Sequence, residues 1–88
     1  MGEKEIQQVE ISLENYLHNC RVKIGKSIRE IRGKRGYSQE QLAKIMEVNR
    51  STISKIENGK FSISIDYLAK FSWYLAFDFS LVDNKILT

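Results

Sequence analysis

The chain has 88 residues and a mass of 10.3 kDa, which is enough for one small domain with a single core. A hydrophobic fraction of 42% and a charged fraction of 28% exclude wholesale disorder. No apolar run approaches the ~20 residues that a membrane-spanning helix needs. We therefore expect no membrane contact. The one cysteine, Cys20, cannot form an internal disulfide, so we expect a protein of the reducing cytoplasm.

The charge is unevenly distributed, although the net charge is only +3. Residues 1–20 carry one basic and four acidic side chains, a net charge of −3. Residues 21–60 carry eleven basic and four acidic side chains, a net charge of +7. A basic middle after an acidic start is typical of a polyanion-binding surface, but it also suits a solvated helix face.

The absence of proline and the small number of glycines favour helices. Residues 1–11 have weak periodicity and are predicted to be a flexible tail. From residue 12 to about residue 35, apolar residues recur at three-and-four spacing, which predicts one bent helix or two helices with Ser12 as a possible cap. The stripe consists of Leu13, Tyr16, Leu17, Cys20, Ile24, Ile28 and Ile31.

Two short helices with a tight break are expected next. Ser38 followed by Gln41 is a capping box, which predicts a helix over residues 39–46. Asn49 is a suitable cap for a second helix over residues 50–58. Neither helix would persist alone in water, so both must share a core and cross steeply. This helix-turn-helix geometry presents the second helix outward, where it fits the major groove of B-DNA.

The carboxyl-terminal part is predicted to begin with a helix capped by Ser64 over about residues 65–75. Its expected core positions are Ile65, Leu68, Ala69, Phe71 and Leu75. Residues 77–83 then alternate apolar and polar residues, which predicts a strand. A lone strand needs an edge, so we expect residues 77–88 to pair across a homodimer.

Three segments of the chain form a recognisable series of motifs. They read IGKSIREIR at residues 24–32, YSQEQLA at residues 37–43 and TISKIENGK at residues 52–60. Together they resemble the Cro/C1-type (XRE) helix-turn-helix family of phage repressors and antitoxins. The resemblance covers about residues 24–76. It implies an all-α, lambda-repressor-like domain of about five helices, here over residues 12–76, that binds double-stranded DNA.

The resemblance also implies roles for individual residues. Those expected at base edges are Arg50, Ser51 and Lys55. Those expected at the DNA backbone are Gln39, Thr52, Asn58 and Lys60. Arg32 and Glu57 resemble the internal ion pair of the family. For the exposed residues, an ordinary solvated helix surface is the alternative interpretation.

The chain departs from the family pattern at three positions. Glu47 and Ala76 stand where glycine is usual, and Ile63 stands where proline is usual. A left-handed backbone at Glu47 would cost ~1–2 kcal/mol, and a slightly different turn is the alternative. The strand-like tail resembles that of antitoxins, in which a terminal strand pairs across the dimer.

More large apolar side chains follow residue 72 than one small core needs. They are Trp73, Tyr74, Phe77, Phe79 and Leu81. We expect them at a homodimer interface; an accessory core against the first helix is the alternative.

The expected function is therefore transcriptional regulation without enzymatic activity, cofactor or metal. His18 and Cys20 are two residues apart and cannot chelate one metal ion from a helix. A dimer reading an inverted repeat would place its half-sites ~34 Å apart. It would act as an autorepressor, a mobile-element repressor or an antitoxin with a toxin partner. The alternative is a co-regulator module of the same fold that does not read DNA specifically.

Overall fold

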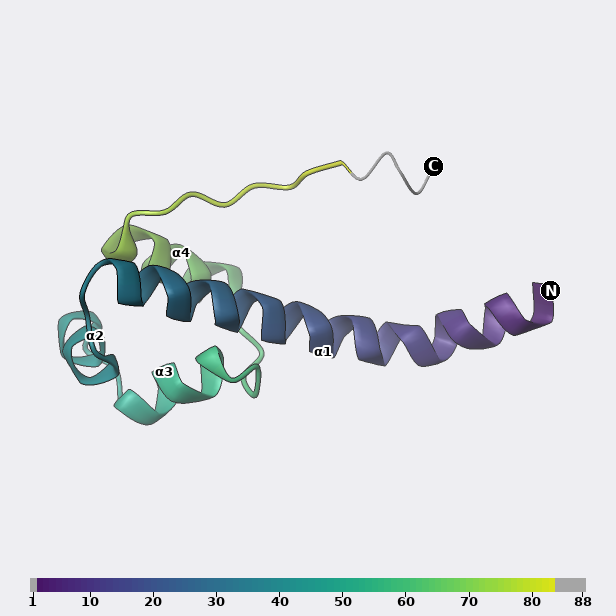
Figure 1. Ribbon diagram of the computed structural model, residues 1–88, viewed down its shortest axis with the longest axis horizontal. Helices are drawn as coiled ribbons and strands as arrows, with labels where there is room; N and C mark the ends of the chain where they lie inside the picture. The colour runs from purple at the N-terminus through teal and green to yellow at the C-terminus, as the bar shows by residue number, and fades with distance from the viewer. Residues whose placement is uncertain (1, 84–88) are drawn as a thin grey trace.

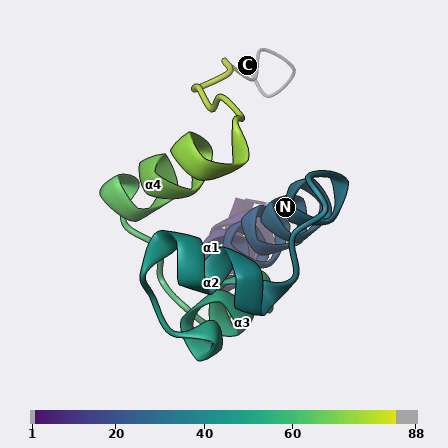
Figure 2. The same cartoon turned by 90° about the vertical axis from the view of Figure 1, so that its left-hand side faces the viewer.

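The computed structural model describes residues 2–83, with side chains from Ser12 onward. This part of the chain consists of four helices: α1 (Gly2–Lys34), α2 (Gln39–Met46), α3 (Arg50–Glu57) and α4 (Ile65–Leu75). Figure 1 shows α1 as a long rod whose amino-terminal half extends beyond the other helices. The helices α2 and α3 lie against one side of its carboxyl-terminal half, and α4 lies toward the other side (Figure 2).

The all-α prediction agrees with this architecture, but two details were wrong. The described residues form four helices and not five, and residues 77–83 form no strand. An alternating pattern alone does not make a strand, because the backbone of a strand also needs an edge to pair with. The remainder of the expected tail, residues 84–88, lies outside the described part of the chain.

The first helix is longer than its expected bounds. It runs without interruption past Gly25, so residues 12–34 belong to one helix, and Ser12 is inside it and is not its cap. The helix begins at Gly2, within the segment expected to be a tail. The mobility of residues 1–11 stays a prediction.

One core joins all four helices. Its fully buried members are Ile28, Leu42, Ala43, Met46, Ile53, Ile56, Phe71 and Leu75. The two-turn helices α2 and α3 contribute five of these eight side chains, so burial compensates for their poor intrinsic stability. On α4 the prediction was partly wrong, because Ile65 and Ala69 are exposed and only Phe71 and Leu75 are fully buried.

The predicted capping box at the start of α2 is confirmed. The Ser38 hydroxyl accepts a hydrogen bond from the Gln41 amide at 3.0 Å, and the Ser38 amide donates to the Gln41 side-chain oxygen at 2.8 Å. At the start of α4 the Ser64 hydroxyl accepts a hydrogen bond from the Tyr67 amide at 3.1 Å, without the reciprocal bond. Both non-glycine positions at helix ends, Glu47 and Ala76, are left-handed, with φ of 57° and 56°. The chain therefore carries ~1–2 kcal/mol of backbone strain at each.

No helix within residues 2–83 combines the length and the apolar character required to cross a membrane.

Candidate nucleic-acid interface

The helix α3 separates an apolar inner side from a polar outer side. Its inner side buries Ile53, Ile56 and Glu57. The outer side is formed by the residues expected to contact base edges, all of which are exposed: Arg50, Ser51 and Lys55. Of the four expected backbone contacts, Asn58 and Lys60 are exposed and Gln39 and Thr52 are half-buried. The structure thus brings these seven residues together on α3, its carboxyl-terminal turn and the start of α2.

The position of α3 depends on a close approach to α1 at Gly25. A Cβ at this position would lie 2.8 Å from the backbone oxygen of Glu57 and would also clash with the oxygen of Ile56. Only glycine lets the last turn of α3 pack this closely against α1. After α3, Gly59 adopts a left-handed conformation with φ of 71°, and the Lys60 amide donates to the Lys55 carbonyl at 2.8 Å. These contacts fix α3 with its outer side toward solvent.

Arg32 of α1 and Glu57 of α3 form a bidentate ion pair beneath the interface. The Arg32 Nε donates to Glu57 Oε2 at 2.6 Å, and Nη2 donates to Oε1 at 2.9 Å. The third guanidinium nitrogen, Nη1, donates to the Tyr37 carbonyl at 2.9 Å. The hydrogen bond with Glu57 raises the pKa of Arg32, and burial opposes this effect in part. Arg32 therefore connects the end of α3 to α1 and to the segment that precedes α2.

A chain of hydrogen bonds continues from this ion pair to the surface. The Gln39 side-chain nitrogen donates to Glu57 Oε1 at 3.0 Å, while its oxygen accepts from Arg50 Nη1 at 3.2 Å. Gln39 thus holds the Arg50 guanidinium at the amino-terminal end of α3. From the sequence these four residues were assigned to three separate groups, because their contact depends on how α2 and α3 cross and not on their spacing in the sequence.

Asn58 has a structural role that the sequence analysis did not predict. Its side-chain nitrogen donates to the Ser54 carbonyl at 2.8 Å, so the side chain closes the end of α3. A phosphate contact by this side chain would use its second N–H.

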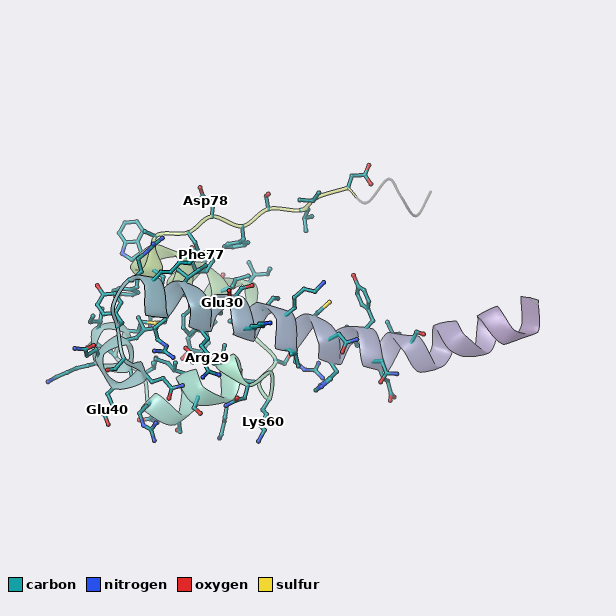
Figure 3. The ribbon with its side chains drawn as sticks, in the orientation of Figure 1. Arg29, Glu30, Glu40, Lys60, Phe77 and Asp78 are labelled. Carbon is teal, nitrogen blue, oxygen red and sulfur yellow. The ribbon has the colours of Figure 1, made fainter. Side chains whose placement is uncertain are left out.

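The sequence analysis also missed Arg29, which is exposed and lies on the α3 side of α1 in Figure 3. The signal for this residue was helical spacing, because Arg29 follows Gly25 by four positions and precedes Arg32 by three. Lys60 is directed outward near the other end of α3 in the same view.

The five expected dimer-interface residues lie in different environments. Trp73 is 82% exposed on α4, whereas Tyr74 packs partly against the core. Phe77 also packs against the core, and together with Phe79 and Leu81 it lines an apolar groove beside α1. Tyr74 and Phe77 therefore fit the alternative of an accessory core, and the homodimer interface stays a prediction.

Among the side chains described, no three His, Cys, Asp or Glu residues gather in a way that could hold a metal ion.

Comparisons with known proteins match the same part of the chain. A family model described as "Helix-turn-helix" matches residues 28–80. A competence pilus inhibition repressor of Acinetobacter baylyi is 37% identical over 65 residues, which are 69% of this chain and 59% of that protein. The control protein C.BamHI of Bacillus amyloliquefaciens is 35% identical over 74 residues, which are 76% of this chain and 91% of that protein. No solved structure gives a significant match.

The family match covers more than half of the chain and spans all of α2, α3 and α4. It includes the Arg32–Glu57 pair and every residue of the candidate interface. The chain belongs to the Cro/C1-type (XRE) helix-turn-helix family of DNA-binding transcriptional regulators.

Proposed function

We propose that this protein is a repressor that binds an inverted DNA repeat as a homodimer, with α3 of each copy in the major groove of one half-site. The observation that carries the proposal is the exposed polar side of α3, held outward by the core and by the Arg32–Glu57 pair. The names of the two relatives, a repressor and a control protein, support a role in transcriptional control.

Three exposed side chains would read the sequence of the operator. Arg50, Ser51 and Lys55 carry donors and acceptors of the kind that pair with base edges, and none of them is bulky enough to block the approach of the groove. The hydrogen bond from Gln39 would restrict the guanidinium of Arg50 before DNA arrives, which lowers the entropy lost on binding.

Four further residues would set the register on the duplex. Gln39, Thr52, Asn58 and Lys60 surround the two ends of α3, where phosphates of both strands approach a helix in the major groove. Their contacts would raise affinity for any sequence and would make binding sensitive to salt.

Dimerisation would use the apolar surface that follows α3 in the chain. Trp73 on α4 is the largest exposed ring among the described side chains, and Tyr74 lies next to it in the sequence. A two-fold interface of this kind buries the same patch from both copies. It would present two copies of α3 to half-sites ~34 Å apart.

Selection of binding sites from a random duplex pool tests the proposal. The wild-type chain is expected to enrich an inverted repeat, and Arg50→Ala is expected to lose ~1–3 kcal/mol of discrimination at one position of each half-site. Lys60→Ala should weaken all duplexes equally and reduce the salt slope by about one.

Lys70→Ala, an exposed change on α4, is the control and should enrich the same repeat as the wild type. Enrichment that Arg50→Ala leaves unchanged would contradict the assignment of base contacts. A wild-type chain that enriches no sequence at all would favour the co-regulator alternative.

A further inference from the structure

The amino-terminal half of α1 carries an apolar stripe that no described residue covers. Leu13, Tyr16 and Leu17 are 59%, 66% and 49% exposed, and Cys20 is half-buried. We name these four residues the amino-terminal stripe. They share one face of α1 with Ile24, Ile28 and Ile31 one to three turns farther along. A helix extended into water gains no stability from such a stripe, so the pattern points to a partner.

The stripe leads into an apolar groove of about 630 Å³ beside the carboxyl-terminal half of α1. One wall of the groove is α1 with Ile24 and Ile31, and the opposite wall is the segment after α4 with Phe77, Phe79 and Leu81. Figure 1 shows this segment running back along α1 toward its amino-terminal half. The groove and the stripe therefore form one continuous apolar surface along a single helix.

The charges of α1 favour one occupant, a second copy in antiparallel orientation. Residues 10–20 have a net charge of −2, whereas residues 24–34 carry four basic side chains and one acidic one, a net charge of +3. Two antiparallel copies of α1 place the acidic half of each beside the basic half of the other, while a parallel pair places like charges together.

We propose that two copies of this chain associate through α1, with the amino-terminal stripe of each copy in the groove of the other. In this register Leu13 lies opposite Ile31 of the second copy, Leu17 opposite Ser27, and Cys20 opposite Ile24. The symmetry axis passes between the two helices at the level of position 22 along each, and the helices overlap over ~27 Å. Phe79 and Leu81 cover the inserted stripe from the other side.

This association leaves the DNA-binding surfaces on opposite outer sides of the assembly. The α3 side of α1 is marked by Gly25, which lies ~130° around the helix from the centre of the stripe. Figure 3 shows the same arrangement, with Lys60 on one side of α1 and Phe77 and Asp78 on the other. If the proposed function holds, the back-to-back pair joins two DNA segments, and the half-sites of one operator are paired by a different surface.

Sedimentation equilibrium of paired variants tests the association without DNA. Leu17→Glu places a charge on the exposed stripe and is expected to halve the mass of the wild-type assembly. Asn15→Glu makes the same change in charge on the opposite, exposed face of the same helix and is expected to leave the mass unchanged. Helical circular dichroism of both variants should equal that of the wild type, because neither side chain belongs to the core.

Excimer fluorescence of pyrene attached to cysteine tests the orientation. In the antiparallel register the two Cys20 residues are offset by ~6 Å along the helix axis, so pyrene at Cys20 is expected to form excimers. Pyrene at Leu13→Cys in a Cys20→Ser chain, on the same face of the helix, should give none, because the offset there is ~27 Å. A parallel pair would give excimers at both positions.

Capture of a second duplex tests the consequence for DNA. Wild-type protein on an immobilised operator is expected to retain a second labelled operator, and Leu17→Glu should bind the first duplex equally well but retain no second one. An unchanged mass for Leu17→Glu, excimers at position 13, or a monomeric wild type that binds only a different protein would overturn the proposal. If no operator can be selected but the mass and excimer results hold, only the proposed function fails.

Discussion

The two halves of α1 carry the same spacing of apolar residues but differ in what surrounds them. Ile28 in the carboxyl-terminal half is 1% exposed and belongs to the core shared by all four helices. Leu17 in the amino-terminal half is 49% exposed and has no cover within the described side chains. The comparison teaches that helical periodicity predicts which face of a helix is apolar, whereas the tertiary arrangement decides where along the helix that face is buried.

The largest effect expected within this comparison comes from breaking the ion pair of the carboxyl-terminal half. Arg32→Ala leaves the Glu57 carboxylate buried without its cation, which typically costs ~3–5 kcal/mol of unfolding free energy. Arg29→Ala removes a neighbouring exposed guanidinium and is the control, with an expected change within ~0.5 kcal/mol. Urea denaturation measures the unfolding free energy of the two variants. An equal loss in both would show that the Arg32–Glu57 pair contributes no more to stability than an exposed arginine.

Truncation of one apolar side chain in each half tests the comparison directly. Ile28→Ala creates a cavity in the core and is expected to lower the unfolding free energy by ~2–5 kcal/mol. Leu17→Ala removes a side chain that is already half in water and is expected to cost less than ~1 kcal/mol in dilute solution. Equal losses would mean that the amino-terminal stripe is covered within a single chain.

Two glycines of α1 are expected to respond in opposite directions. Gly25→Ala drives a methyl group against backbone oxygens of α3, which must shift, so a loss of ~1–3 kcal/mol is expected. Gly33→Ala meets no atom within 4 Å and should gain ~0.5–1 kcal/mol from its better helix propensity. Thermal denaturation of the two single variants separates the effect of close packing between α1 and α3 from that of helix propensity. A stabilising Gly25→Ala would contradict the close approach of α3 to α1 at this position.

The smallest expected effect concerns the alkaline limit of stability. Burial raises the pKa of Tyr67, which stacks on Phe71 at 5.7 Å between ring centres. Since the unfolded chain loses the phenolic proton first, stability is complete below pH ~10 and falls as the pH rises through and above that value. Tyr67→Phe should lose less stability between pH 8 and pH 11 than the wild type, as followed by urea midpoints.

Tyr16→Phe is the matched control for this titration, because Tyr16 is exposed on α1. It should keep the full alkaline loss of the wild type. The same pH profile for both variants would mean that the contribution of Tyr67 is negligible.

Local signals in the sequence were sufficient to predict most of the fold around the interface. The start of α2 followed from Ser38 and Gln41, because a capping box is a contact within one turn. The family pattern, in which glycine occupies position 47, offered a left-handed Glu47 as one of two possibilities, and the structure has that one. The strand was mispredicted because alternation in residues 77–83 describes side chains only and provides no pairing edge.

The parts of the site that escaped prediction depend on contacts across the fold. The bridge from Glu57 through Gln39 to Arg50 joins three positions on two helices, and its geometry arises from their crossing. The groove beside α1 depends on the path of the segment after α4, for which the sequence has no local signal.

Chemical-shift mapping by NMR during titration with the selected operator tests the central claim most directly. The account predicts the largest amide shifts at the start of α2 and along α3 through Lys60, with the amino-terminal stripe of α1 unaffected at the first equivalent of duplex. Shifts concentrated on α1 and the groove, with the amides of α3 unchanged, would contradict the claim that α3 is the surface that reads DNA.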